Sequence, residues 1–263
     1  GGFPRYSVDE RWLVPHFEKM LYDNALLTWV YLEAYQATGE ELYRGVVVET
    51  LDYALREMSQ PGGGYYSAQD ADSEGEEGRY FVWTPEEVAD ILGPDDGALF
   101  CSYYDITAEG NFEGGGSILH VDEEVPELSR RLGVDEAKLT DTVAEGRRRL
   151  LARRYQRIPP NRDDKILVSW NGLMISAMAQ AYQVLGDGRY LASAAASASF
   201  ILDRMVADGG LLHTYKDGKA SVRAYQDDYA CLVNALLDLY EASFEVSWLC
   251  RACELTRSMI ARF

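Results

Sequence analysis

Three stretches of this sequence are apolar on nearly every side of a helix, and each is followed by a stretch with one clearly polar face. The apolar stretches are residues 20–35, 169–185 and 228–240. The stretches that follow them are residues 40–58, 189–205 and 246–263. A helix that is apolar all round is buried all round, whereas an amphipathic helix covers a core on one side only. The alternation predicts helical hairpins in which inner helices are wrapped by outer ones.

The spacing of matching residues supports an internal repeat. The pairs are Asn24 with Asn171, Gly39 with Gly186, and Tyr43 with Tyr190, at a constant offset (171 − 24 = 147). Asp228 follows Asn171 by a smaller step (228 − 171 = 57). The larger offset leaves room for one more hairpin and an insertion, and residues 84–92 and 135–155 have helical character. We therefore expect about four hairpins; the alternative is an irregular helical bundle.

Composition excludes several classes of partner. The 263 residues are 47% hydrophobic, which suffices for a substantial core. The 25 Lys and Arg against 43 Asp and Glu give a net charge of −18, so we expect no nucleic acid and no anionic membrane as partner. No apolar run reaches the roughly 20 residues of a membrane helix. The four Cys do not form a disulfide framework and no signal peptide is visible, so we expect a cytoplasmic protein.

Residues 62–83 contain a short acidic stretch that resembles a calcium loop. Asp70, Asp72 and Glu74 occupy its first, third and fifth positions, but the twelfth position, which needs an acid, is Phe81. We instead expect residues 64–68 and 79–83 to pair as a β-ribbon with the acidic stretch as its tip. Thr84, Pro85 and Glu87 then begin a helix, as a cap, a first-turn proline and a capping-box acid.

Five long motifs give the chain a resemblance to a known family. They are residues 1–27, 62–87, 110–121, 163–175 and 225–242. On these motifs the chain resembles the spermatogenesis-associated protein 20 and bacterial YyaL family. The resemblance implies a thioredoxin-like domain followed by a six-hairpin α/α toroid, similar to N-acylglucosamine 2-epimerase, cellobiose epimerase and six-hairpin glycosidases. One departure is Pro4, where the family usually has His.

The implied fold class is all-α: an incomplete α/α toroid with short β-ribbons. Residues 1–263 would form a single toroid domain, roughly hairpins two to five, without the thioredoxin-like domain. A cut ring would expose apolar hairpin faces, so we expect self-association.

In an α/α toroid the ends of the inner helices line a central funnel. Each inner helix here opens with an aromatic residue followed by polar ones, which suits a sugar because rings stack on its apolar face. The expected substrate-binding residues are Tyr22, Asp23, Trp170, Asn171, Gln226 and Asp227. The alternative is that Asp23, Asn171 and Asp228 merely cap their helices.

The expected catalytic residues are His16, Asp70, Asp72 and Asp228. His16 is the best general-base candidate because its ordinary pKa lies close to neutrality. Epimerisation needs a base and an acid on opposite faces of one carbon, and His16 with one of the aspartates would supply them. A hydrolase would instead use two carboxylates, Asp70 with Asp228. The ribbon tip would fold over the funnel with Asp70 and Asp72 turned inward. The alternative for His16 is a structural histidine bonded to a carbonyl.

We expect no metal and no cofactor, because the His residues are dispersed and no phosphate-binding glycine loop is present. His120 and His213 are expected to be structural residues in strands. Cys250 and Cys253 lie on one face of an amphipathic helix, several residues from its start, and we expect them to be buried packing.

The leading hypothesis is a carbohydrate-processing domain, a sugar epimerase or isomerase or otherwise a glycoside hydrolase, with a small saccharide as ligand. The alternative is a non-catalytic helical scaffold that works with a thioredoxin-like domain of the same full-length chain. A third hypothesis is a thiol-redox role of Cys250 and Cys253.

Overall fold

The computed structural model describes residues 1–207 and 209–263. These residues divide into two compact units. The first unit consists of residues 1–5, 18–69 and 162–263, and the second of residues 6–17 and 70–161. The single domain expected over residues 1–263 stays a prediction, because the structure defines each unit on its own.

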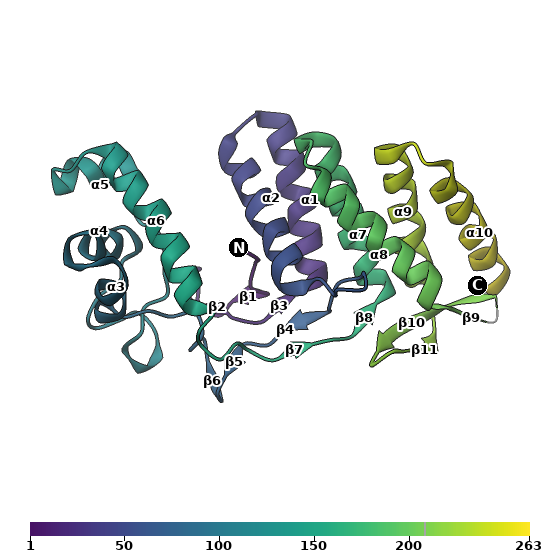
Figure 1. The fold of residues 1–263 in the computed structure, drawn as a ribbon, viewed down its shortest axis with the longest axis horizontal. Coiled ribbons are helices and arrows are strands. Elements are labelled where there is room, and N and C mark those ends of the chain that lie inside the picture. Colours follow the sequence, from purple (N-terminus) through teal and green to yellow (C-terminus); the bar gives the residue numbers. More distant parts are fainter. Residues whose placement is uncertain (208) are drawn as a thin grey trace. The chain divides into compact units, whose positions relative to one another are not determined.

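Within the described residues, the first unit contains three helical hairpins (Figure 1). They are α1 (Leu21–Thr38) with α2 (Glu41–Tyr53), α7 (Val168–Leu185) with α8 (Gly188–Arg204), and α9 (Gln226–Ser243) with α10 (Val246–Arg262). A π-helical turn, Ala54–Met58, continues α2. The inner helix α7 packs against both α1 and α9. The expected inner and outer helices are therefore confirmed.

The hairpin turns confirm the internal repeat. Gly39 and Gly186 each end an inner helix in the left-handed conformation, with φ of 73° and 74°. Each donates its backbone N–H to a tyrosine carbonyl four residues earlier. Phe244 does the same after α9 with φ 58°, although a side chain makes this conformation costly.

Two buried asparagines, Asn24 and Asn171, bind neighbouring backbone segments to the starts of the inner helices through hydrogen bonds. Asn171 Oδ1 accepts the N–H of Tyr65 (2.7 Å), and its Nδ2 donates to the carbonyls of Tyr65 (2.9 Å) and Leu167 (3.0 Å). Its repeat partner Asn24 makes the same three bonds, accepting from the N–H of Phe3 and donating to the carbonyls of Phe3 and Met20. Each amide thus pairs with a backbone peptide as a neighbouring strand would.

A close approach between α7 and α9 depends on Gly172. A Cβ at this position would lie 2.7 Å from the carbonyl carbon of Cys231. No other residue type fits without moving one helix, so the absent side chain sets how closely these two inner helices pack.

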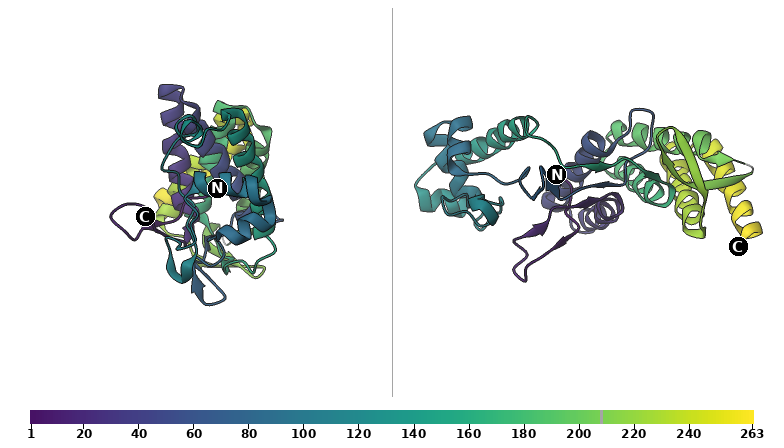
Figure 2. Two further views of the ribbon diagram at one scale, coloured as in Figure 1. Left: turned by 90° about the vertical axis from the view of Figure 1, so that its left-hand side faces the viewer. Right: turned by 90° about the horizontal axis from the view of Figure 1, so that it is seen from below.

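Short antiparallel strands lie at the starts of inner helices in the first unit. Strands β3 (Lys19–Met20), β4 (Ala68–Gln69) and β7 (Arg162–Asp163) form one sheet in the order β3–β4–β7. A second sheet has the order β11 (Lys219–Arg223), β10 (Gly210–Lys216), β8 (Ile166–Leu167), with β9 (Val206–Ala207) also paired to β10. Seen from below in Figure 2, the β10–β11 ribbon lies near the C-terminal end of the chain, where Arg262 donates to the carbonyl of Gly209 (2.8 Å).

The second unit contains α3 (Pro85–Leu92), α4 (Pro94–Tyr104), α5 (Val125–Leu132), α6 (Glu136–Arg154) and a 3₁₀ turn, Glu113–Gly115. Its strands are β1 (Tyr6–Ser7) with β2 (Pro15–His16), and β5 (Asp72–Ser73) with β6 (Glu76–Glu77). Helix α6 packs against α3, α4 and α5. The expected helices over residues 84–92 and 135–155 are confirmed, as is the Thr84–Glu87 capping box.

The expected β-ribbon between residues 64–68 and 79–83 is wrong. Tyr65 bridges to Ser59 and Trp83 to Ser117, and only the two-residue strands β5 and β6 pair at the acidic tip. The reason is competition for hydrogen bonds. Asn171 takes the peptide groups of Tyr65, and β3 and β7 take those of β4.

The expectation that Cys250 and Cys253 are buried is also wrong. Both thiols are free and exposed on α10. The buried side of this helix is instead formed by Ala252 and Leu255.

Among the described helices, none combines the length and the apolarity that crossing a membrane requires.

We expect Asn171→Ala to lower the free energy of unfolding by about 3 kcal/mol, because it leaves the buried peptide groups of Tyr65 without partners. Chemical denaturation measures this change. The exposed Asn161 provides the control, since Asn161→Ala removes an amide that the core does not use. Equal stability of the two variants would contradict the structural role assigned to Asn171.

Candidate functional site

Two of the predicted substrate-binding residues meet at the starts of the inner helices. The rings of Tyr22, in α1, and Trp170, in α7, pack edge to face with their centroids 4.8 Å apart. Both side chains are half-buried. The packing of α1 against α7 therefore brings together aromatic residues that are far apart in the sequence.

Asp23 lies beside this pair in the first turn of α1. Its Oδ2 atom is buried and has no hydrogen-bond partner among the described atoms. Burial raises the pKa of the Asp23 carboxyl, Arg5 opposes this rise, and Glu18 adds to it. Arg5 is itself paired with Glu18 at 3.1 Å.

Two other predicted site residues, Asp228 and Asn171, use their side chains in hydrogen bonds within the protein. Asp228 has no exposed surface, and its carboxylate accepts the N–H groups of Ser169 (3.0 Å) and Tyr225 (2.9 Å). It also lies 2.8 Å from Nδ1 of His213, which belongs to strand β10. Asn171 is equally buried and bonds to backbone. These contacts give both residues a structural role, and their predicted catalytic and binding roles stay predictions.

Gln226 and Asp227 are exposed at the start of α9, beside an exposed Tyr225. Both side chains are accessible to a ligand. Among the described residues, no hydrogen bond or ring contact joins them to the pair of Tyr22 and Trp170. Their binding roles stay predictions as well.

A pocket of about 300 Å³ lies between the three inner helices. We call it the inner-face pocket; its lining includes Leu26 and Trp29 of α1, Ser176 and Gln180 of α7, and Asn234, Asp238 and Glu241 of α9. Leu26 and Trp29 follow Tyr22 by four and seven residues, and Leu173 and Gln180 follow Trp170 by three and ten. Such spacing places the pocket on the same helix faces as the aromatic pair.

Asp238 is the chemically distinctive residue of the inner-face pocket. Burial raises the pKa of its carboxyl and Glu241 raises it further, whereas hydrogen bonds with Ser176 and Gln180 partly offset the rise. Asp238 was not among the residues predicted from the sequence, because those lie near the helix starts and in the acidic stretch. The available signal was an acid nearly three turns into a stretch, residues 228–240, that is otherwise almost wholly apolar.

We expect Asp238→Asn to raise the free energy of unfolding at neutral pH. The pKa of Asp238 in the folded protein lies above its ordinary value of 3.8, so the folded state holds the proton more tightly than the unfolded chain. Wild-type stability therefore falls as the pH rises through the window that begins near 3.8, and Asn removes this loss.

Denaturation curves recorded between about pH 4 and about pH 8 test this expectation. The gain should shrink toward the acid end. Asp203→Asn, at an exposed position on α8, serves as the control and should give no such pH-dependent difference. A loss of stability in Asp238→Asn at neutral pH would contradict the expectation.

The remaining predicted catalytic residues belong to the second unit. His16 lies in β2, half-buried, with its ring 4.8 Å from that of Tyr6. Asp70 and Asp72 are both exposed, and Asp70 accepts the N–H of Ala71 (2.7 Å). Convergence of these three residues with Asp228 in one pocket stays a prediction, because Asp228 belongs to the first unit.

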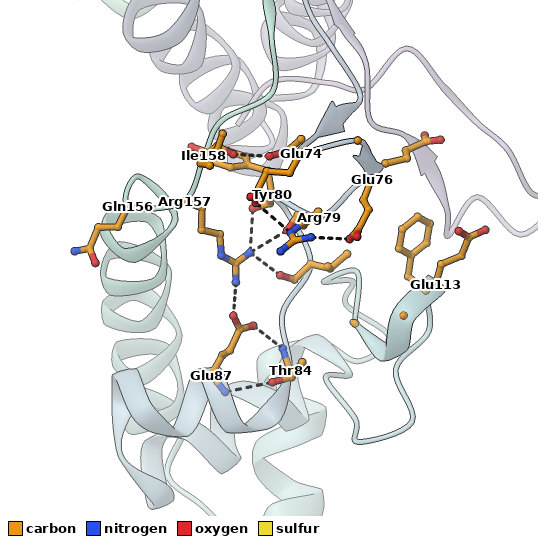
Figure 3. Close-up of a pocket in the computed structure, with 17 residues that line it drawn as sticks. Glu74, Glu76, Arg79, Tyr80, Thr84, Glu87, Glu113, Gln156, Arg157 and Ile158 are labelled. Carbon is orange, nitrogen blue, oxygen red and sulfur yellow. Dashed lines mark hydrogen bonds and ion pairs between the residues drawn. The ribbon is translucent and has the colours of Figure 1, made fainter.

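A hollow of about 930 Å³ lies within the second unit, between the β5–β6 hairpin, the glycine-rich segment 112–116 and the end of α6 (Figure 3). Arg157 donates to the carbonyls of Tyr80 (3.1 Å) and Val82 (2.8 Å) and to Glu87 (2.9 Å). Its guanidinium also stacks over Trp83 at 3.9 Å. The donors of Arg157 are thus committed to the chain segment that leads into α3.

We expect Arg157→Ala to destabilise the second unit by about 2 kcal/mol, because the carbonyls of Tyr80 and Val82 lose their donor and Trp83 loses its stacked cation. Chemical denaturation followed by tryptophan fluorescence measures the change. Arg148→Ala, which removes an exposed Arg–Glu pair on α6, is the control and should shift stability by less than about 1 kcal/mol. A similar shift in both variants would contradict this anchoring role.

Three side chains of the second unit come close enough to share a cation. Asp105, His120 and Asp122 place ligand atoms within 4.8 Å of one another, with His120 Nε2 at 3.6 and 3.4 Å from the two carboxylates. Both aspartates are exposed. Exposed carboxylates beside a histidine are common without a metal ion, so this group alone does not indicate a metal centre.

No family model matches the sequence. The chain is 38% identical over 282 residues to human spermatogenesis-associated protein 20, a match that covers 94% of this chain and 36% of the human protein. The chain thus spans about a third of the length of the curated relatives it matches.

Two solved structures are similar in fold. A D-mannose isomerase superimposes with a TM-score of 0.51 and 13% identity, covering 90% of this chain and 39% of the isomerase. A family 76 glycoside hydrolase (mannosidase) from Bacteroides thetaiotaomicron gives a TM-score of 0.52 and 11% identity, covering 93% of this chain and 45% of the hydrolase. At such identities the likeness concerns the fold, and it confirms the α/α toroid class.

Proposed function

We propose, from the premise that this chain is homologous to a part of spermatogenesis-associated protein 20, that its inner-face pocket binds a saccharide and catalyses a proton transfer on it. The toroid fold is shared with sugar isomerases and glycoside hydrolases, which supports carbohydrate processing as the class of function. The residues of the pocket support the particular site and reaction.

The observation that carries the proposal is the combination of an aromatic wall with a carboxyl group of raised pKa. Trp29 is 45% exposed, so its ring is available to stack on the apolar face of a pyranose. Gln180 and Asn234 each offer an amide donor and an amide acceptor to sugar hydroxyls. A carboxyl whose pKa is moved toward neutrality is suited to take and return a proton.

The arrangement of the carboxylates favours isomerisation among the expected reactions. Asp238 and Glu241 lie three residues apart on one helix and so approach a bound ligand from the same side. Glycoside hydrolysis needs two carboxylates flanking the scissile bond, and epimerisation at one carbon needs groups on both faces. Aldose–ketose isomerisation of the open-chain sugar moves one proton from C2 to C1 on a single face, by way of an enediol, while a second proton passes from the C2 hydroxyl to O1. One carboxylate can carry the carbon-bound proton, and water carries the hydroxyl proton. Asp238 is therefore the proposed base.

The test is proton exchange and product formation by NMR, with aldohexoses and ketohexoses incubated in D₂O. We expect Asp238→Asn to lower the rate by roughly 100-fold or more, since it removes the base. Trp29→Ala should weaken saccharide binding. Trp12→Ala and Asp203→Asn, which change an exposed tryptophan and an exposed aspartate outside the pocket, are the matched controls.

The same assay decides between the sites. Loss of turnover in His16→Ala, Asp70→Asn, Asp72→Asn or Asp228→Asn, with Asp238→Asn active, would move the chemistry to the catalytic residues predicted from the sequence. Absence of any saccharide binding would contradict the proposal and favour the non-catalytic scaffold that works with a thioredoxin-like domain.

A further inference from the structure

We infer that the inner-face pocket selects an amino sugar, a saccharide with a protonated primary amine, over the corresponding neutral sugar. This inference rests on the proposed function, because it concerns the ligand of the same pocket. Within it, Asp238 keeps its role as the base, and Glu241 is the partner of the ammonium group.

The inner-face pocket carries an uncompensated negative charge. Asp238 and Glu241 are its two acidic residues, and none of the described residues that line it is basic. No ion pair joins either carboxylate to a cation among the described residues. Carboxylates held together without a counter-charge repel one another, and a half-buried one also loses hydration. A bound ammonium group relieves both costs.

The two carboxylates of the pocket are placed for different roles. Glu241 is exposed, whereas Asp238 is half-buried against Ser176 and Gln180. One helical turn separates them, about 5–6 Å between Cβ atoms. A ligand that holds its ammonium group at Glu241 therefore keeps a neighbouring ring carbon near Asp238. Binding of the amine and transfer of the proton then use different groups.

The aromatic and amide residues that line the pocket also suit an ammonium group. Trp29 faces the pocket and attracts a cation through its ring as well as stacking on sugar C–H groups. The amide oxygens of Gln180 and Asn234 are further acceptors for the three ammonium hydrogens. Leu26 and Leu173 add apolar surface to the lining, which suits the C–H groups of a sugar.

The test is isothermal titration of the chain with D-glucosamine, D-glucose and N-acetyl-D-glucosamine at low and high salt. D-Glucosamine is a probe of binding alone, because its C2 carries the amine in place of the hydroxyl that aldose–ketose isomerisation needs. We expect D-glucosamine to bind roughly tenfold more tightly than D-glucose, the sum of one ion pair and one cation–π contact. N-acetylation removes the charge and should abolish the preference. High salt should reduce it, because the pocket is open to ions at Glu241.

The variant Glu241→Gln should bind all three sugars with similar affinity while keeping its affinity for D-glucose. Glu254→Gln, which changes an exposed glutamate on α10 outside the pocket, is the control and should keep the preference. Equal binding of the three sugars by the wild-type chain would overturn this inference and leave the proposed function standing. Binding of none of them would overturn both.

Discussion

The first unit depends on buried amide and carboxylate groups at the starts of its inner helices. Asn24 and Asn171 each use one side chain to satisfy both polar groups of a peptide that passes the helix end. Asp228 satisfies the N–H groups of Ser169 and Tyr225 at the third helix. Since buried peptide groups without partners are costly, these contacts fix where the connecting segments run. The short strands that lie beside the helix starts follow from that constraint.

The inner-face pocket is a consequence of how closely the inner helices approach. Gly172 lets α7 and α9 pack against each other near their starts. Farther along, polar residues such as Gln180 and Asp238 stand where apolar residues would have completed the core. A carboxyl kept there at a cost to stability is a frequent property of functional sites. Packing and chemistry are therefore linked at the same three helices.

In the second unit, one side chain organises a wall of the hollow of about 930 Å³. Arg157 binds the backbone on either side of Phe81 and stacks on Trp83, so a cation holds the segment that leads into α3. The acidic stretch that resembled a calcium loop is an exposed hairpin turn, with Arg79 paired to Glu74 and Glu76.

The sequence by itself determined the helices of the three hairpins, α3 and α6, the inner and outer alternation, the 147-residue repeat and the cap at Thr84, because each depends on local periodicity or on neighbours in the chain. It did not indicate α4 and α5. It also singled out Tyr22 and Trp170 at the starts of two inner helices, where their rings pack together. Only the tertiary structure decided that Tyr65 pairs with Asn171 rather than within a ribbon, that Cys250 and Cys253 are exposed, and that Asp238 faces a pocket. These outcomes depend on which distant groups compete for one hydrogen bond or one helix face, and the local pattern of residues does not record that competition.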